Sequence, residues 1–413
     1  MQLTAGCRKL FCMRPATRAV HAGERLAPAG WKSVTTPIYP SATYIYEDIA
    51  TLERVAGGEE NGYMYSRYAH PTGHALELAV AALEAGEDEA AAPACVSFAS
   101  GMAALHAAIL ASGLQAGDAI LCSQDVYGAT IGLLRNLFTP LGVRIELASL
   151  SQPAAWPEQF AAARPRLVLV ETLSNPLLRV PDLEALAAAA HAAGARLLVD
   201  STFATPLLCR PLELGADFVV HSATKFLAGH GDVLGGVALA REPETAGLEL
   251  QRKLAGGVLG PFEAWMILRG LKTLPLRLER QCRTALELAH WLAAHPAIER
   301  VHYPGLESHP DHAIARRQFP AGQFGGILSF ELGGAGRERV YRFFNALRIV
   351  LPATSLGDVQ SLALYPAASS HRDLSPKQRR EAGIGDNLVR LSCGIEAVED
   401  LREDLERALT VIG

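Results

Sequence analysis

One aspartate and one lysine stand just after two apolar runs in the middle of this chain. Asp200 closes the run at 196–200, and Lys225 follows the run at 217–221. Both runs predict short buried strands, and ligands of open α/β sheets bind beyond the carboxyl ends of such strands. A lysine can hold an aldehyde covalently, and a carboxylate can keep a pyridine nitrogen protonated. Pyridoxal phosphate (PLP) needs both groups, so the pair predicts a PLP site.

Each residue alone has an ordinary explanation, because many aspartates cap helices and most lysines are exposed to solvent. Lys225, however, ends the sequence Ser222-Ala223-Thr224-Lys225. The hydroxyl groups of Ser222 and Thr224 can donate to or accept from a phosphate. The combination favours the PLP interpretation over the ordinary one.

A second phosphate-binding element is expected at Ser100-Gly101-Met102, which precedes an apolar helical stretch. The backbone N–H groups of Gly101 and Met102 then lie at a helix N-terminus, where an anion is stabilised. Ser-Gly before a helix is also a common plain cap. Together with Ser222 and Thr224, the sequence predicts a cup for the phosphate.

Motifs along the chain resemble those of the Cys/Met-metabolism PLP enzymes, which include cystathionine γ-synthase, cystathionine γ-lyase, methionine γ-lyase and O-acylhomoserine sulfhydrylase. The resemblance runs from about Thr17 to the C-terminus. The motifs are YSRYAHPT at 65–72, FASGMAAL at 98–105, ETLSNP at 171–176, VDSTFATP at 199–206, HSATKFLAGHGD at 221–232, RGLKTLPLR at 269–277 and RLSCGIE at 390–396.

The resemblance implies Lys225, Tyr127 and Asp200 as catalytic residues. Tyr127 would stack over the PLP ring and handle a proton at the leaving group, although a half-buried core tyrosine is the commoner case. Asn175 would bind the phenolic oxygen of PLP, and Tyr65 and Arg67 would reach the phosphate from a partner subunit. The implied PLP contacts are Tyr65, Arg67, Gly101, Met102, Tyr127, Asn175, Asp200, Thr202, Ser222, Thr224 and Lys225.

The resemblance also implies a substrate site. Arg390 would bind the α-carboxylate with its two-pronged guanidinium, assisted by Ser355 and Asn175. Members that use cystathionine often carry glutamates where this chain has Met64 and Thr354. Without those acids a distal ammonium would be buried without a partner, so cystathionine is disfavoured as the best substrate.

Three positions depart from the usual family pattern. His70 stands where asparagine usually precedes Pro-Thr, and Ser201 stands where asparagine usually follows the ring acid. Ala129 occupies the position of a reactive cysteine in methionine γ-lyase. Ala129 argues against a standard methionine γ-lyase and the short chain argues against a typical O-acetylhomoserine sulfhydrylase, so the choice between the two activities stays open.

Composition excludes some other classes. The chain has 413 residues, a formal net charge of −5 and no Lys/Arg run, so a nucleic-acid partner is not expected. Seven scattered cysteines without a C-x-x-C pair indicate reduced thiols and a cytoplasmic location. No apolar run is long enough to span a bilayer, and no metal site is expected. Met13 is a possible start, because the family-like sequence begins just after it.

The alternation of apolar strands with Ala/Leu-rich helices predicts an α/β fold with a mostly parallel sheet flanked by helices. The resemblance makes this the fold type I of PLP-dependent transferases. We expect an extended N-terminal arm at 1–62, a PLP-binding domain at 63–261 and a smaller C-terminal α/β domain at 262–413. A long helical segment from about 262 to 295 is expected to be interrupted at Pro275.

The expected function is γ-elimination or γ-replacement on a sulfur amino acid or an O-acylhomoserine, by a homotetramer built from dimers with shared sites. Cystathionine γ-lyase and γ-synthase activities are the alternatives within the family. A PLP-binding regulatory protein without turnover is disfavoured by the complete set of Lys225, Asp200, Tyr127 and Arg390. A Rossmann dehydrogenase is disfavoured because no G-x-G-x-x-G follows an early strand.

Overall fold

The computed structural model describes residues 13–24, 33–85, 93–334, 336–369, 372, 377, 379 and 382–412. The chain divides into two compact units that alternate along the sequence. Unit 1 comprises Met1–Gly113, Asp217–Ala228 and Asp232–Pro275, and unit 2 comprises Leu114–Ala216, Gly229–Gly231 and Leu276–Gly413. The three predicted domains stay a prediction.

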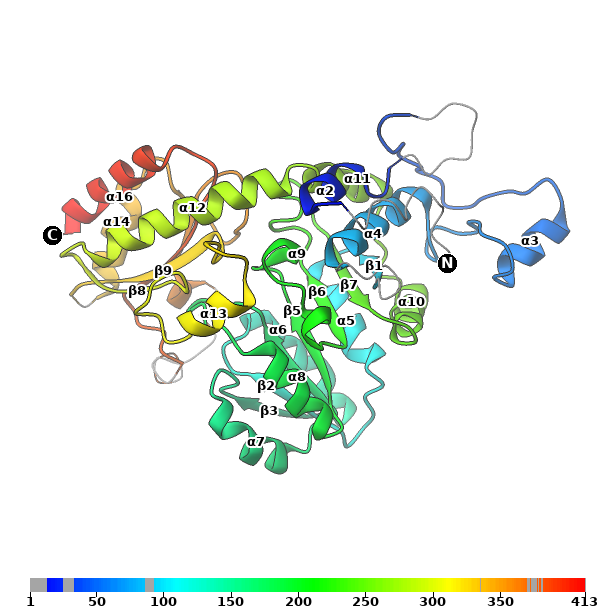
Figure 1. Ribbon diagram of the computed structural model, residues 1–413, viewed down its shortest axis with the longest axis horizontal. Coiled ribbons are helices and arrows are strands. Elements are labelled where there is room, and N and C mark those ends of the chain that lie inside the picture. Colours follow the sequence, from blue (N-terminus) through cyan, green and yellow to red (C-terminus); the bar gives the residue numbers. More distant parts are fainter. Residues whose placement is uncertain are drawn as a thin grey trace. The chain divides into compact units, whose positions relative to one another are not determined.

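Unit 1 contains three strands in the order β1-β7-β6, with β7 antiparallel to both neighbours. Helices α4 and α5 pack against these strands, α11 and α2 pack against α4, and α10 packs against α5 (Figure 1). Its elements are α2 (Pro15–His21), α3 (Ile49–Ala56), α4 (Pro71–Glu84), β1 (Ala94–Phe98), α5 (Gly101–Ala111), β6 (Phe218–His221), β7 (Gly236–Ala240), α10 (Glu244–Ala255) and α11 (Pro261–Leu271).

Helix α4 shows why this unit folds. Leu76, Val80 and Leu83 recur at helical spacing and are buried, so one face of the helix is apolar. At its first turn the Thr72 hydroxyl donates to the Pro37 carbonyl at 3.0 Å and accepts from the Tyr39 N–H at 3.0 Å. These bonds fix the extended segment that precedes the helix.

Unit 2 contains a parallel set of strands in the order β5-β4-β2-β3, and α7 and α8 pack against β2 and β5. Strands β2 and β4 are buried at every position, as expected of parallel strands covered on both faces. The elements of this part are β2 (Ala119–Ser123), α6 (Gly128–Leu133), a π-helical turn (Leu134–Phe138), 3₁₀ turns (Thr139–Leu141, Pro153–Ala155 and Pro211–Leu214), β3 (Arg144–Ala148), α7 (Trp156–Ala163), β4 (Leu167–Glu171), α8 (Leu183–Ala192), β5 (Arg196–Asp200) and α9 (Thr205–Leu208).

A second sheet in unit 2 has the order β10-β11-β12-β9-β8 and is mainly antiparallel. Helix α14 packs against α16 (Figure 1). The elements are α12 (Leu274–Ala293), whose first two residues belong to unit 1, β8 (Ile298–His302), α13 (His312–Gln318), β9 (Ile327–Leu332), α14 (Arg337–Ala346), β10 (Leu351–Pro352), β11 (Leu362–Leu364), a 3₁₀ turn (Pro366–Ala368), β12 (Leu388–Ser392) and α16 (Val398–Ile412).

The predicted fold class is confirmed, with two differences in detail. The expected arm contains two short helices, α2 and α3, in addition to extended chain. The helical segment after residue 260 breaks at Lys272 and Thr273, so Pro275 lies in the first turn of α12, where a missing N–H costs no hydrogen bond. The Ala/Leu-rich stretch at 182–193, predicted to be helical, forms α8 as expected.

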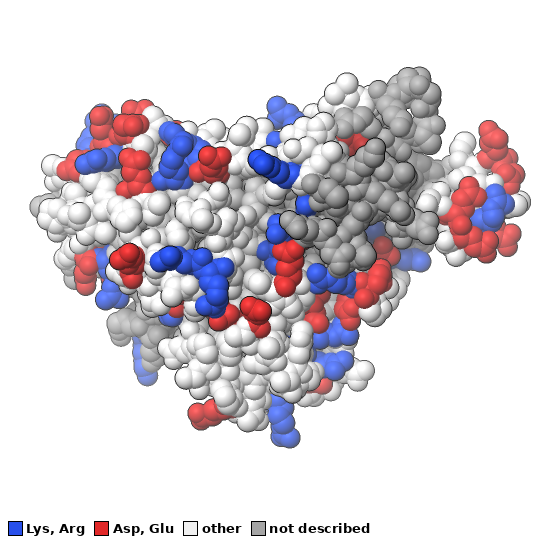
Figure 2. Space-filling model, in the orientation of Figure 1, with Lys and Arg blue, Asp and Glu red and all other residues white. Residues whose placement is uncertain are grey.

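Neither sign of charge dominates the face shown in Figure 2, where Lys and Arg are interspersed with Asp and Glu. Within the ranges given above, none of the helices combines the length and the apolar character needed to cross a membrane.

Asp404 joins α16 to the chain after α14. Its buried carboxylate accepts three backbone N–H groups, from Arg348, Ile349 and Val350, each at 2.9 Å, and also bonds Arg407. Burial alone would raise the pKa of Asp404, but the three N–H donors and Arg407 outweigh it and hold the pKa below its usual value. The carboxylate therefore contributes stability in its charged form.

We expect Asp404→Asn to lower the free energy of unfolding by about 1–3 kcal/mol at pH 7, because an amide cannot replace all of these charge-assisted bonds. The loss is present above the unfolded pKa near 4 and shrinks as pH falls through the lower folded pKa. Urea unfolding at pH 7 and at pH 3 measures both. Asp400→Asn, at an exposed position of the same helix, is the matched control; an equal effect there would contradict the assignment.

Candidate active site

The predicted phosphate cup begins at the N-terminus of α5. The Ser100 hydroxyl caps this helix by accepting the Ala103 N–H at 3.1 Å. The N–H groups of Gly101 and Met102 have no acceptor among the described residues. Two adjacent donors at the positive end of a helix suit an oxyanion such as phosphate.

Ser222 lies directly against this helix terminus. A Cβ atom placed on Gly101 would come within 2.7 Å of the Ser222 Cβ and 2.9 Å of its Oγ. Only glycine therefore lets the two segments approach so closely, and the approach places the serine hydroxyl beside the helix N-terminus. Gly101, Met102 and Ser222 are thus brought together as the sequence predicts.

Thr224 and Lys225 follow in a turn after β6. The Thr224 hydroxyl accepts the Gly235 N–H at 3.0 Å and donates to the Gly235 carbonyl at 3.2 Å. The Lys225 N–H donates to the Ser222 carbonyl at 3.1 Å, which closes the turn. Unit 1 therefore holds the hydroxyls and the lysine of the predicted motif within one compact turn.

Tyr65 and Arg67 lie together elsewhere in unit 1. The Arg67 guanidinium stacks 5.3 Å from the centre of the Tyr65 ring and 5.1 Å from that of Tyr68, and it donates to the Lys253 carbonyl at 2.6 Å. Met64 is half-buried beside them in the sequence. His70, which stands where asparagine usually precedes Pro-Thr, caps α4, since its Nδ1 accepts the Gly73 N–H at 3.0 Å.

In unit 2, Asp200 ends β5 at the edge predicted from the sequence. Its Oδ1 accepts the Thr202 N–H at 3.0 Å and the Thr202 hydroxyl at 2.5 Å. These two bonds fix the orientation of the carboxylate. Thr202 is therefore placed to orient Asp200, and Ser201 between them is buried.

Glu171 is a site residue that the sequence reasoning missed, although it opens the ETLSNP motif. It ends β4 and pairs with Asp200 across the parallel ladder. Its Oε1 accepts the Tyr127 N–H at 2.6 Å, while its Oε2 is buried without a hydrogen bond from any described residue. Burial, and then the charge of Asp200, raise the pKa of Glu171 well above its usual value. A second acid at a strand end was the signal that could have revealed it.

Tyr127 occupies the N-cap position of α6 and is 43% exposed. It is therefore accessible, unlike a core tyrosine. Ala129 follows it in the same helix. The bond from Glu171 to the Tyr127 backbone fixes the start of α6, and with it the direction in which the phenol leaves the chain.

Arg390 on β12 is only 2% exposed. Its Nη1 donates to the Asn175 Oδ1 at 3.0 Å and its Nη2 to the Ser355 carbonyl at 3.0 Å. Its Nε is buried without a partner, and no acid of the described residues forms an ion pair with it. Burial lowers its pKa to about 10, although Tyr127 and Glu171 oppose the shift.

The predicted substrate group is thus partly assembled in unit 2. Asn175 and Ser355 both contact Arg390, but Ser355 does so through its backbone carbonyl. Thr354, next to it, is exposed. An unpaired buried cation with an unsatisfied N–H suits a carboxylate, and the helix terminus with Ser222 suits a phosphate. The residues of unit 1 therefore fit the phosphate of PLP, and those around Arg390 in unit 2 fit the carboxylate of an amino acid.

The chain belongs to the Cys/Met metabolism PLP-dependent enzyme family, whose model matches residues 16–410. It is a PLP-dependent enzyme of sulfur amino-acid metabolism, and PLP is its cofactor.

Relatives within the family carry different activities. The chain is 42% identical to an O-succinylhomoserine sulfhydrylase of Pseudomonas aeruginosa, over 96% of this chain and 95% of the relative. It is 39% identical to an L-methionine gamma-lyase of Pseudomonas putida, over 95% of this chain and 96% of the relative. A crystal structure of cystathionine gamma synthase from Xanthomonas oryzae pv. oryzae, in complex with aminoacrylate and cysteine, matches with a TM-score of 0.89 and 38% identity, over 97% of this chain and 98% of that one.

We expect Gly101→Ala to weaken PLP binding and to destabilise the protein by roughly 1–3 kcal/mol, because the new methyl must push Ser222 away from the helix terminus. Thermal unfolding and bound PLP per chain are the measurements. Gly132→Ala is the matched control, since a Cβ there meets nothing within 4 Å and alanine favours a helix. Unchanged PLP content in Gly101→Ala would argue against the cup.

Proposed function

We propose that this enzyme catalyses γ-replacement or γ-elimination on a four-carbon amino acid whose γ-substituent carries no ammonium group. O-acylhomoserine with sulfide, and methionine, are the leading substrates. The observation that carries the proposal is the buried Arg390 guanidinium, held by Asn175 and Ser355 with its Nε unsatisfied. A substrate α-carboxylate would supply the missing charge and acceptor.

PLP, when bound, supplies an electron sink for negative charge that develops at the substrate Cα. Lys225 would hold the cofactor and then, as a base, remove the Cα proton. Asp200 would keep the pyridine nitrogen protonated. The two bonds from Thr202 to Oδ1 support this role because they stabilise the charged form of the Asp200 carboxylate.

Tyr127 would donate a proton to the departing γ-substituent. Its exposed phenol and its fixed position at the start of α6 support this role. Glu171 would act as a positioning residue, because its carboxyl accepts the Tyr127 N–H, and burial followed by the charge of Asp200 raises its pKa. With water the products are 2-oxobutanoate, ammonia and the leaving group; with a thiol or sulfide the product is a new thioether or thiol.

The choice of substrate rests on Met64 and Thr354, where cystathionine users of the family tend to carry acids. Neither side chain offers a countercharge for a distal ammonium. The names of two relatives, O-succinylhomoserine sulfhydrylase and L-methionine gamma-lyase, point in the same direction. Relatives named cystathionine gamma-lyase and cystathionine beta-lyase, at 40% identity, keep cystathionine as the alternative.

We expect kcat/KM for O-succinylhomoserine with sulfide, or for methionine, to exceed that for cystathionine. The double variant Met64→Glu with Thr354→Glu should shift the ratio toward cystathionine by about tenfold or more, because a charge-assisted contact contributes roughly 1.5–3 kcal/mol. The isosteric neutral variant Met64→Gln with Thr354→Gln is the control. A wild-type enzyme that strongly prefers cystathionine would refute this specificity.

We also propose that the active unit is at least a dimer, within a homotetramer, in which Tyr65 and Arg67 complete the phosphate cup of a partner subunit. The stacked Tyr65–Arg67 pair and the apolar side chains exposed along the preceding segment, such as Val34 and Ile45, support an intersubunit role. A cytoplasmic location remains part of this proposal.

Arg67→Ala and Lys225→Ala should each be inactive, because one loses a phosphate ligand and the other the base. Mixed protomers should recover activity, since a heterodimer retains one site with both residues. After full subunit exchange, about one quarter of wild-type activity is expected from an equal mixture. Mixing Lys225→Ala with Asp200→Ala is the control. If one protomer supplies both Asp200 and Lys225 to a site, each site of this heterodimer lacks one of the two residues, so no activity should return. No recovery with Arg67→Ala, despite demonstrated exchange, would exclude a shared site.

A further inference from the structure

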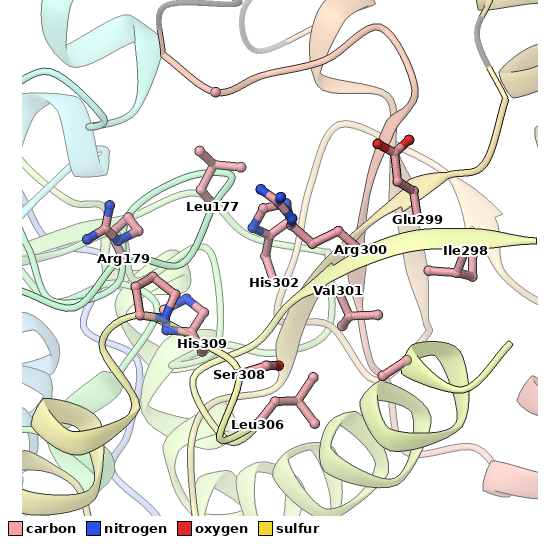
Figure 3. Close-up of a pocket in the computed structure, with 13 residues that line it drawn as sticks. Leu177, Arg179, Ile298, Glu299, Arg300, Val301, His302, Leu306, Ser308 and His309 are labelled. Carbon is pink, nitrogen blue, oxygen red and sulfur yellow. The ribbon is translucent and has the colours of Figure 1, made fainter. Parts of the chain in front are cut away.

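Unit 2 contains a cavity of about 540 Å³ that includes none of the site residues discussed above. Its walls come from the loop that follows Asn175, the end of α12, strand β8 and the loop at 306–310 (Figure 3). Cavities that bind small molecules have volumes of about 300–1,000 Å³. The volume is therefore sufficient for a metabolite.

One part of the wall is apolar and could hold an aliphatic group. Leu177, Val301 and Leu306 line it, and Figure 3 shows these side chains with Ile298 around the same space. Strand β8 is the edge strand of the second sheet, and a bulge at Glu299 shifts its pairing with β9. A bulge redirects neighbouring side chains, so Glu299 and Arg300 both line the cavity.

His309 supplies a buried N–H that forms no hydrogen bond of good geometry among the described residues. The residue is 5% exposed, and its Nδ1 accepts the Asp311 N–H at 3.2 Å. Burial lowers its pKa to about 4, against the opposing effects of Asp311 and the Leu177 carbonyl, so the ring is neutral at pH 7 and carries its proton on Nε2. This Nε2 forms no hydrogen bond of good geometry within the described residues, the Leu177 carbonyl included. Such a group calls for an external acceptor.

Two lining groups already have partners of opposite charge. Arg179 binds Asp311 through two nitrogens, at 2.6 and 3.0 Å, and His302 bonds Glu331 at 2.7 Å. Arg300 is exposed and has no ion pair within the part of the chain that the structure describes. Glu299 is also exposed, and among the described residues its Oε2 accepts only from the neutral Asn387 amide at 3.3 Å. Glu299 and Arg300 are thus exposed charges on adjacent residues, and neither forms an ion pair among the described residues.

We propose that this cavity binds an aliphatic α-amino acid at a site separate from the active site. Arg300 and the His309 Nε2–H bind the carboxylate, Glu299 binds the ammonium, and the side chain packs on Leu177, Val301 and Leu306. A zwitterion matches this lining because a simple carboxylate would meet Glu299 unpaired and a simple amine would meet Arg300. The assignment does not depend on which substrate the active site turns over.

The probe is L-leucine, which has no γ-leaving group and therefore cannot undergo γ-elimination. Equilibrium dialysis of the PLP-loaded enzyme with labelled leucine gives total binding, and the absorption change of the cofactor gives the fraction in the active site. We expect about one molecule per chain beyond that fraction. Binding that the cofactor signal accounts for completely would overturn the proposal.

Two variants locate the extra molecule. Ser308→Trp places a large side chain in the cavity lining and should abolish the extra binding, whereas Glu307→Trp, at the adjacent exposed residue outside the lining, should keep it. Arg300→Gln should raise the Kd about tenfold or more, whereas Arg316→Gln, an exposed arginine of α13, should leave it unchanged. Neither Ser308 nor Arg300 belongs to the proposed active site, so turnover should persist in both.

Two leucine analogues test the zwitterion. 4-Methylpentanoate lacks the ammonium and 3-methylbutylamine lacks the carboxylate, and each should bind the cavity at least tenfold more weakly than leucine. Binding of 4-methylpentanoate as tight as that of leucine would refute the role of Glu299. Extra binding that survives Ser308→Trp would place the molecule elsewhere and refute the site.

Discussion

A guanidinium that is withdrawn from water constrains the architecture of unit 2. A buried cation is costly unless acceptors surround it, and among the described residues Arg390 donates to two, the Asn175 Oδ1 and the Ser355 carbonyl. Both acceptors come from segments far from β12 in the sequence, so these segments must be held in place before any ligand arrives. Glu171 and Tyr127 lie close enough to favour the charged form of Arg390, yet neither neutralises it. Arg390 therefore keeps a positive charge that a substrate α-carboxylate could neutralise.

The loop that carries Asn175 is secured from several sides. The Ser174 N–H donates to the Arg179 carbonyl and the Arg179 N–H donates to the Ser174 hydroxyl, both at 3.0 Å, and Ser329 on β9 donates to the Pro176 carbonyl at 2.6 Å. Asp311 accepts from the Arg179 guanidinium and also from the Val180 N–H. This loop presents Asn175 to Arg390 while Leu177 and Arg179 form a wall of the cavity. A short, well-bonded connection therefore separates two regions of different chemistry.

The sequence predicted those features that depend on local pattern. The apolar runs at 196–200 and 217–221 became β5 and β6, and Ser100-Gly101 became the capped start of α5, because burial and capping act over a few residues. Features that depend on distant contacts were missed. The raised pKa of Glu171 depends on its burial and on its pairing with Asp200, and the role of the Ser355 carbonyl requires β12 to lie beside it. The break before α12 was placed near Pro275, although the first turn of a helix tolerates proline. The cavity joins residues from several segments, so no single motif announces it.

The cysteines of this enzyme report on how tightly the core is closed. The five at 95, 122, 209, 282 and 393 are buried, and burial raises the pKa of Cys282 to about 12 and those of Cys95, Cys122 and Cys393 above their usual value. A reagent that alkylates thiols can therefore react with them only after the surrounding core opens. Cys7 and Cys12 lie outside the described residues, and replacing both with serine would leave only buried thiols. The rate of alkylation would then measure the rate at which the native state opens, with no label added to the chain.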